Sequence, residues 1–143
     1  MIYTKLSKRA MALAYEAHRG QTDKGGLPYI YHPIHLAEQM DSENAVCVAL
    51  LHDVVEDTEW TLESLSDEGF PEIVIDALAV LTHDADTEYF DYIEKISVNE
   101  IASKVKTADL KHNSDLSRLD DISDETIRQM DKYSAALGIL ASK

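Results

Sequence analysis

The hydrophobic residues of this chain recur at the spacing of an α-helix along most of its length. In residues 5–18, for example, Leu6, Leu13 and Ala17 fall on one stripe. No stretch alternates with the two-residue period of a half-buried strand. The same helical period recurs over 72–81, 87–97 and 99–113.

Glycine, proline and capping residues divide these segments. Gly20, Gly25, Gly26 and Pro28 predict a loop over 19–31, and Pro33 suits the start of a short helix over 33–40. A further short helix is bracketed by Thr61 and by the Gly69-Phe70-Pro71 stop. Ser123 is a good N-cap for a last helix over 123–140.

The apolar segment 43–56 fits a buried helix or, from its valine content alone, a strand. Its length favours the helix. The pattern therefore predicts an all-α fold, a compact bundle of about seven or eight helices.

Composition narrows the class of protein. The chain has 143 residues, 27 acidic and 13 basic, with a formal charge of −14. This length predicts a single domain over 1–143, and no apolar run reaches the roughly 20 residues of a membrane span. The N-terminus has no signal-peptide pattern, and the lone Cys47 excludes an intramolecular disulfide, so we expect a cytoplasmic protein. The acidity disfavours nucleic acid as a partner but allows a small anionic substrate held by a metal.

Candidate chemistry lies in Leu51-His-Asp-Val-Val-Glu-Asp-Thr58. On a helix, with His52 at zero, Glu56 falls near ~40°, Asp53 near ~100° and Asp57 near ~140°. The four ionisable side chains therefore share one arc. This arc is either a solvated acidic helix end or part of a metal site in which His52 and Asp53 bind a divalent cation. Imidazole with carboxylate suits Mn, Fe or Zn better than Ca.

Two adjacent ligands cannot complete such a site. His32 precedes Pro33 at the mouth of a helix, and Asp109 lies in mid-helix on an inward face. A buried, unpaired Asp would cost several kcal/mol, so pairing or metal binding is expected there. Asn113 lies one turn further on, and His112 could rival Asp109 as a ligand.

These residues form a pattern that resembles the HD-type metal-dependent phosphohydrolase superfamily. The wider pattern is similar to the hydrolase domain of RelA/SpoT-type alarmone enzymes over roughly residues 1–120. It consists, in chain order, of Ala17-His-Arg-Gly-Gln21, Pro28-Tyr-Ile-Tyr-His-Pro33, Leu50-Leu-His-Asp-Val-Val-Glu-Asp-Thr58 and Val105-Lys-Thr-Ala-Asp-Leu-Lys-His-Asn113.

The resemblance implies a small stand-alone hydrolase that uses Mn²⁺, or another divalent cation, to remove the 3′-pyrophosphate of guanosine tetra- or pentaphosphate (ppGpp/pppGpp). It also places His112 behind the ligands rather than among them. By the same resemblance, the metal ligands are His32, His52, Asp53 and Asp109, the catalytic carboxylates are Glu56 and Asp57, and the substrate-binding residues are Lys24 and Asn113.

Two positions depart from the pattern. Asp23 and Asp115 stand where the resemblance leads us to expect arginines, and both changes reverse the local charge near an anionic ligand. Another phosphorylated nucleotide is therefore an alternative substrate. A non-catalytic module that binds an alarmone or a protein is a third hypothesis, disfavoured by the presence of Glu56 and Asp57. An apolar stripe on the last helix either closes the bundle or joins two copies, so monomer and homodimer both stay open.

Overall fold

The structure is a computed structural model that describes residues 1–142. Within this range it contains nine α-helices, one 3-10 turn and no strand, which confirms the all-α prediction. The elements, in chain order, are α1 (Lys5–Ala17), α2 (Tyr31–Ala37), α3 (Glu43–Leu51), α4 (Val54–Asp57), α5 (Leu62–Asp67), α6 (Glu72–Leu81), α7 (Tyr89–Ser97), α8 (Glu100–Asn113), η1 (Leu116–Arg118) and α9 (Asp124–Ala141).

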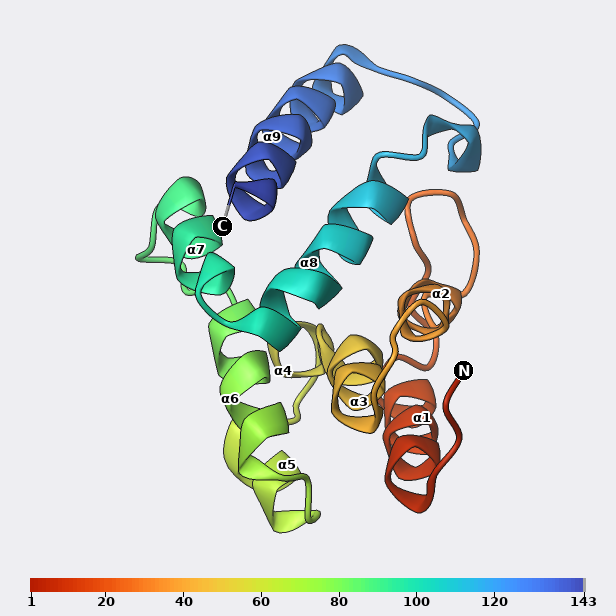
Figure 1. Cartoon of the computed structure of the whole chain (residues 1–143). Coiled ribbons are helices and arrows are strands. Elements are labelled where there is room, and N and C mark those ends of the chain that lie inside the picture. The colour runs from red at the N-terminus through yellow and green to blue at the C-terminus, as the bar shows by residue number, and fades with distance from the viewer. Residues whose placement is uncertain (143) are drawn as a thin grey trace.

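Helix α3 is the centre of the bundle, and it packs against α1, α2, α6 and α8 (Figure 1). All of its residues from Ala45 to Leu51 are buried. The Ser42 side chain caps its start by accepting a hydrogen bond from the amide of Ala45. An apolar helix of this kind gains its stability from burial on all sides, and its C-terminal end is thereby fixed inside the bundle.

The predicted helix over 43–56 is wrong in one respect, because it breaks at His52 and Asp53 into α3 and α4. The Nδ1 atom of His52 lies 2.7 Å from the Ala49 carbonyl oxygen. In a continuous helix, that carbonyl oxygen would accept a hydrogen bond from the amide of Asp53. The break accounts for nine helices where about seven or eight were predicted, and it separates Asp53 from the helical arc that the sequence suggested.

The apolar stripe of α9 closes the bundle, since α9 packs against α7 and α8 (Figure 1). Ala136 and Leu140 are buried, whereas Ile127 near the start of the helix is exposed. Ser123 is its N-cap, as predicted. Helix α2 begins at Tyr31, two residues earlier than expected, so that His32 lies in its first turn.

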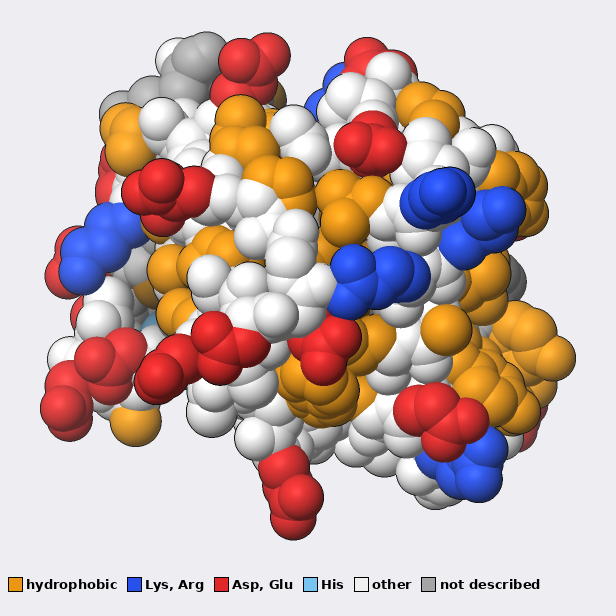
Figure 2. All heavy atoms as spheres, turned by 90° about the horizontal axis from the view of Figure 1, so that it is seen from below, with side chains coloured by type: hydrophobic (Ala, Val, Ile, Leu, Met, Phe, Trp, Pro, Cys, Tyr) orange, Lys and Arg blue, Asp and Glu red, His pale blue; other side chains and the backbone are white. Residues whose placement is uncertain are grey.

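The acidic excess is spread over the surface. In the face shown in Figure 2, several Asp and Glu side chains lie next to one another at the lower left, and others stand singly elsewhere on the face. Lys and Arg form no continuous stripe on that face either. Among the helices of residues 1–142, none is both long and apolar enough to cross a membrane.

Candidate active site

Three helices bring together His32, His52 and Asp109, which are far apart in sequence. His32 comes from α2, His52 follows α3, and Asp109 lies in the middle of α8. All three are buried, and each offers a ligand atom within 4.8 Å of the others. Asp109 Oδ1 lies 2.8 Å from His32 Nε2 and 3.6 Å from His52 Nε2. The predicted ligands from distant segments therefore converge on one point.

Asp53 lies beside this cluster, with Oδ2 at 3.1 Å from His52 Nε2. The Tyr29 hydroxyl donates a hydrogen bond to the same oxygen. Burial raises the pKa of Asp53, but His52 and Tyr29 outweigh it and lower the pKa to about 2. The carboxylate is thus ionised and held next to the cluster, where all four predicted ligands lie together.

The orientation of His52 fits a bound cation. Its Nδ1 lies 2.7 Å from the Ala49 carbonyl oxygen, so Nδ1 carries the proton. Its Nε2 is buried and has no hydrogen-bond partner, although Asp53 and Asp109 both face it. In the neutral ring, a lone pair would then point at two carboxylates, which is unfavourable unless a proton or a metal cation lies between them. Two imidazoles and two carboxylates are a donor set that suits Mn²⁺, Fe²⁺ or Zn²⁺.

Metal binding must compete with a proton at His52. Burial lowers the pKa of His52, but Asp53 and Asp109 raise it to well above its ordinary value. The raised pKa favours a proton on His52, and a bound cation would have to displace it. We expect the apparent Mn²⁺ affinity to rise with pH, by up to about tenfold per pH unit below the raised pKa of His52, as one proton is released. Calorimetry in buffers of different ionisation enthalpy measures the number of protons released when Mn²⁺ binds. An affinity independent of pH would contradict the claim that Mn²⁺ replaces a proton on His52.

His112 lies behind His32 and is not one of the clustered ligands. The two Nδ1 atoms are 2.7 Å apart, and the rings are stacked. Burial, together with the charges of Arg118, His32 and His35, lowers the pKa of His112 to about 4. A neutral His112 can accept the Nδ1 proton of His32 and leave His32 Nε2 free to bind a metal. The interpretation of His112 as a supporting residue fits this geometry.

Replacing His112 with Phe keeps a flat ring against His32 but removes the acceptor. We expect the affinity for Mn²⁺ to fall by roughly 10–100-fold, the usual effect of losing such a support. Titration with Mn²⁺ measures it. Tyr31→Phe, at an exposed ring on the same helix, is the matched control and should bind as the wild type does. An unchanged affinity in His112→Phe would show that His32 needs no such partner.

Asp109 is also held by two neighbours on its own helix. Lys106 Nζ lies 3.0 Å from Asp109 Oδ2, and Asn113 Nδ2 donates to Asp109 Oδ1 at 3.1 Å. Burial raises the pKa of Asp109, but Lys106, His32 and His52 together lower it well below its ordinary value. Lys106 lies in the candidate site, where the sequence did not place it. Its position one turn before Asp109 on the same face was the available signal.

Glu56 and Asp57 lie on α4, the short helix that begins directly after Asp53, and both are exposed. Glu56 Oε1 accepts a hydrogen bond from the amide of His83 at 3.0 Å. Partial burial and the nearby charge of Asp53 raise the pKa of both carboxyl groups. A carboxylate with a raised pKa is a better proton acceptor near neutral pH, which suits the role predicted for this pair.

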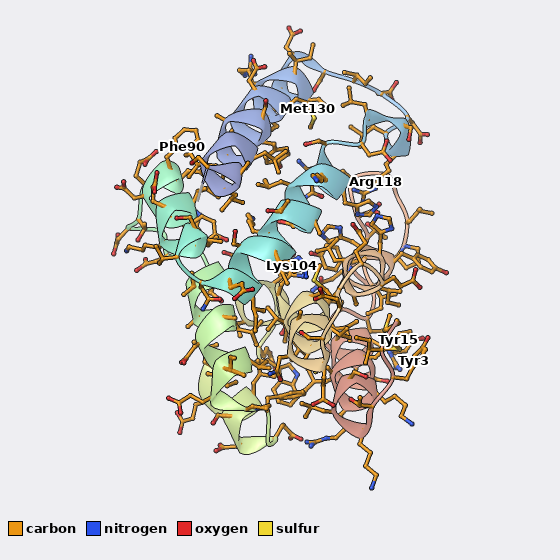
Figure 3. The ribbon with its side chains drawn as sticks, in the orientation of Figure 1. Tyr3, Tyr15, Phe90, Lys104, Arg118 and Met130 are labelled. Atoms are coloured by element: carbon orange, nitrogen blue, oxygen red, sulfur yellow. The ribbon has the colours of Figure 1, made fainter. Side chains whose placement is uncertain are left out.

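A cleft of about 480 Å³ opens over the cluster. His32, Asp53 and Asp109 line its floor, and the predicted substrate residues Lys24 and Asn113 also line it. Its further walls come from η1 and α9. Figure 3 shows Arg118, beyond the end of α8, and Met130, on α9, on different sides of this region. The α9 wall, which includes Met130 and Tyr133, could not be assigned from the sequence.

Asp23 and Asp115, where the resemblance leads us to expect arginines, both line the cleft. Asp23 forms an ion pair with Arg118 at 3.0 Å. Asp115 caps η1, where its Oδ1 accepts from the amide and the hydroxyl of Ser117. Both carboxylates therefore have local partners, because each stabilises a turn at the edge of the cleft.

Comparison with known proteins agrees with this site. The HD domain family matches residues 10–130. The chain belongs to the HD domain family. The match contains all four clustered residues as well as Glu56 and Asp57, so the HD domain holds the complete candidate site.

Two curated relatives are larger proteins. The bifunctional (p)ppGpp synthase/hydrolase SpoT of Escherichia coli is 35% identical over 123 residues, which cover 76% of this chain and 18% of SpoT. The guanosine-3′,5′-bis(diphosphate) 3′-pyrophosphohydrolase of Haemophilus influenzae is 48% identical over 61 residues, which cover 39% of this chain and 9% of that enzyme. The chain thus spans less than a fifth of the length of either relative.

A solved structure has the same fold. It is that of a metazoan ortholog of SpoT that hydrolyses ppGpp, with a TM-score of 0.80 and 24% sequence identity. The superposition covers 98% of this chain and 88% of the metazoan protein. The helical bundle described above is therefore the fold of this metazoan protein over nearly the whole chain.

Proposed function

We propose that this chain is a metal-dependent phosphohydrolase that removes the 3′-pyrophosphate of ppGpp or pppGpp and releases GDP or GTP. The observation that carries the proposal is the buried cluster of His32, His52 and Asp109, with the partly buried Asp53 beside it, under a cleft of about 480 Å³. Its relatives SpoT and the Haemophilus influenzae enzyme are named for this chemistry. We propose Mn²⁺ as the cation, a single domain over 1–143, and the cytoplasm as the compartment.

In this proposal, the residues of the site have three roles: metal binding, proton transfer and binding of the phosphate groups. A divalent cation held by the four ligands would stabilise charge on the phosphoryl oxygens and lower the pKa of a bound water. Glu56 and Asp57, whose pKa values are raised, would orient that water and accept its proton. Lys24 and Asn113 would hold the phosphate groups. The reaction forms one bond from the water oxygen to phosphorus, breaks the bond from phosphorus to the ribose 3′-oxygen, and leaves a proton on that oxygen.

Hydrolysis of another phosphorylated nucleotide is the second candidate. Among the residues that line the cleft, Lys106 is paired with Asp109 and Arg118 with Asp23. The pKa of Glu125 is lowered by Arg128 and Gln129 and further by the charge of Lys24, which places Lys24 near a carboxylate as well. A cleft whose cations already have acidic neighbours favours a nucleotide with fewer charges than ppGpp.

Reconstitution with different metals tests the proposal. Metal-stripped protein is loaded with Mn²⁺, Mg²⁺ or Zn²⁺ and incubated with ppGpp and a panel of other phosphorylated nucleotides. We expect turnover of ppGpp that requires the cation and is fastest with Mn²⁺. Turnover of a different nucleotide would support the second candidate. Stoichiometric metal binding without any turnover would support the binding-module hypothesis instead. Size-exclusion chromatography of the same sample distinguishes monomer from homodimer.

A further inference from the structure

An ion pair joins two distant segments at the rim of the cleft. Arg118 Nη2 donates to Asp23 Oδ2 at 3.0 Å, across 95 positions of the sequence. Figure 1 shows the loop between α1 and α2 rising beside the segment that follows α8. The side chains of Asp23 and Arg118 are only 8% and 20% exposed, so solvent screens this pair less than a surface pair.

Asp23 also fixes the turn that carries Lys24. Its other carboxylate oxygen, Oδ1, accepts hydrogen bonds from the amides of Gly25 at 2.9 Å and Leu27 at 3.0 Å. Burial raises the pKa of Asp23, but these bonds and Arg118 lower it below its ordinary value. The carboxylate is thus a fixed anion that organises residues 23–27 around itself.

Arg118 is held in turn by the end of α8. Its Nη1 donates to the His112 carbonyl oxygen at 2.8 Å, next to Asn113. The loop passes so close to Arg118 that a Cβ atom at Gly25 would lie 2.4 Å from the Arg118 carbonyl oxygen. The guanidinium of Arg118, a residue of η1, therefore contacts both the loop that carries Lys24 and the C-terminal end of α8.

We propose that Asp23 and Arg118 are positioning residues, a latch that holds Lys24 and Asn113 in the relative arrangement that binds the phosphate groups of the nucleotide. Because the pair is neutral as a whole, the latch acts through geometry and adds no net charge to the cleft. The part that concerns the nucleotide rests on the proposed function, whereas the mechanical part, the fixing of the loop, does not.

Amide hydrogen exchange tests the mechanical part without a nucleotide or a metal. Arg118→Met removes the guanidinium, and Asp23→Asn keeps the two backbone hydrogen bonds but removes the charge. We expect the amides of residues 23–27 to exchange roughly tenfold faster in both variants, within the range of couplings between residues of one network. Arg19→Gln is the matched control, since Arg19 starts the same loop but pairs with the exposed Glu16. Its exchange should equal that of the wild type.

Steady-state kinetics tests the effect on the nucleotide. We expect each single variant to raise KM roughly tenfold with kcat changed less than about twofold, and the double variant to be no worse than either single one. Arg118→Lys, which can still pair with Asp23, should restore part of the KM. Circular dichroism melts confirm that each variant is folded.

The outcomes of these experiments distinguish a failure of the latch from a failure of the proposed function. A KM that falls in Asp23→Asn and rises in Arg118→Met would overturn the latch and make Arg118 a direct ligand of the phosphate. Unchanged exchange in both variants would overturn it as well. A wild type that does not hydrolyse ppGpp contradicts the proposed function, while the exchange experiment still decides whether the latch exists.

Discussion

Replacing Asp109 with Asn should abolish stoichiometric Mn²⁺ binding and turnover together. Asn has nearly the same shape, but it lacks the charge that faces His32, His52 and Lys106 in a buried position. Because a bound cation contributes several kcal/mol to the transition state, we expect kcat/KM to fall by about a thousandfold or more. Calorimetry with Mn²⁺ and the hydrolysis assay measure the two effects on the same sample.

Asp41→Asn is the matched control for this experiment. Asp41 forms an ion pair at 2.6 Å with Lys104, which is also on α8, but the pair is exposed and does not line the cleft. Metal binding and turnover should be unchanged in this variant. A melting temperature measured without metal shows whether Asp109→Asn is folded. If folded Asp109→Asn binds Mn²⁺ as tightly as the wild type, Asp109 is not a ligand.

Replacing Glu56 with Gln should separate binding from chemistry. The Gln side-chain oxygen can still accept the hydrogen bond from the His83 amide, but the side chain can no longer accept a proton. We expect Mn²⁺ affinity close to that of the wild type and a kcat lower by about 10²–10⁴-fold, the usual contribution of general acid–base catalysis. Rapid-quench kinetics with saturating nucleotide measures kcat directly.

Glu59→Gln is the control for Glu56→Gln, because Glu59 is exposed and lies just beyond α4. It removes the same charge from the same region and should leave kcat unchanged. A full rate in Glu56→Gln would exclude Glu56 as the proton acceptor and leave Asp57 as the remaining carboxylate of α4.

The clustered residues could be predicted from the sequence because their chemistry is unusual for their positions. An aspartate at position 109, on an otherwise inward helix face, requires a partner or a cation. His52 and Asp53 follow a strongly apolar helix, so the end of α3 carries them to the centre of the bundle. His32, just before Pro33, was a candidate from the sequence, and the resemblance to RelA/SpoT-type hydrolases includes it in the implied ligand set.

The parts that depend on tertiary contacts could not be predicted in the same way. Helical periodicity extends through His52, and only the bond from its ring to the Ala49 carbonyl reveals the break there. The ion pair of Asp23 could not be predicted because its partner, Arg118, is 95 positions away and lies on a 3-10 turn that no pattern predicted. The helical spacing puts Lys106 and Asp109 on one face of α8, but only the structure shows that Lys106 Nζ lies 3.0 Å from Asp109 Oδ2.

Product analysis with ¹⁸O-labelled water tests the central claim most directly. Mn²⁺-loaded protein is incubated with ppGpp, and the products are separated and weighed by mass spectrometry. Attack of water on the phosphorus bonded to the ribose 3′-oxygen predicts unlabelled GDP and pyrophosphate that carries one ¹⁸O atom. Release of inorganic phosphate, label in GDP, or no turnover of ppGpp would contradict the assignment of this site as a 3′-pyrophosphohydrolase.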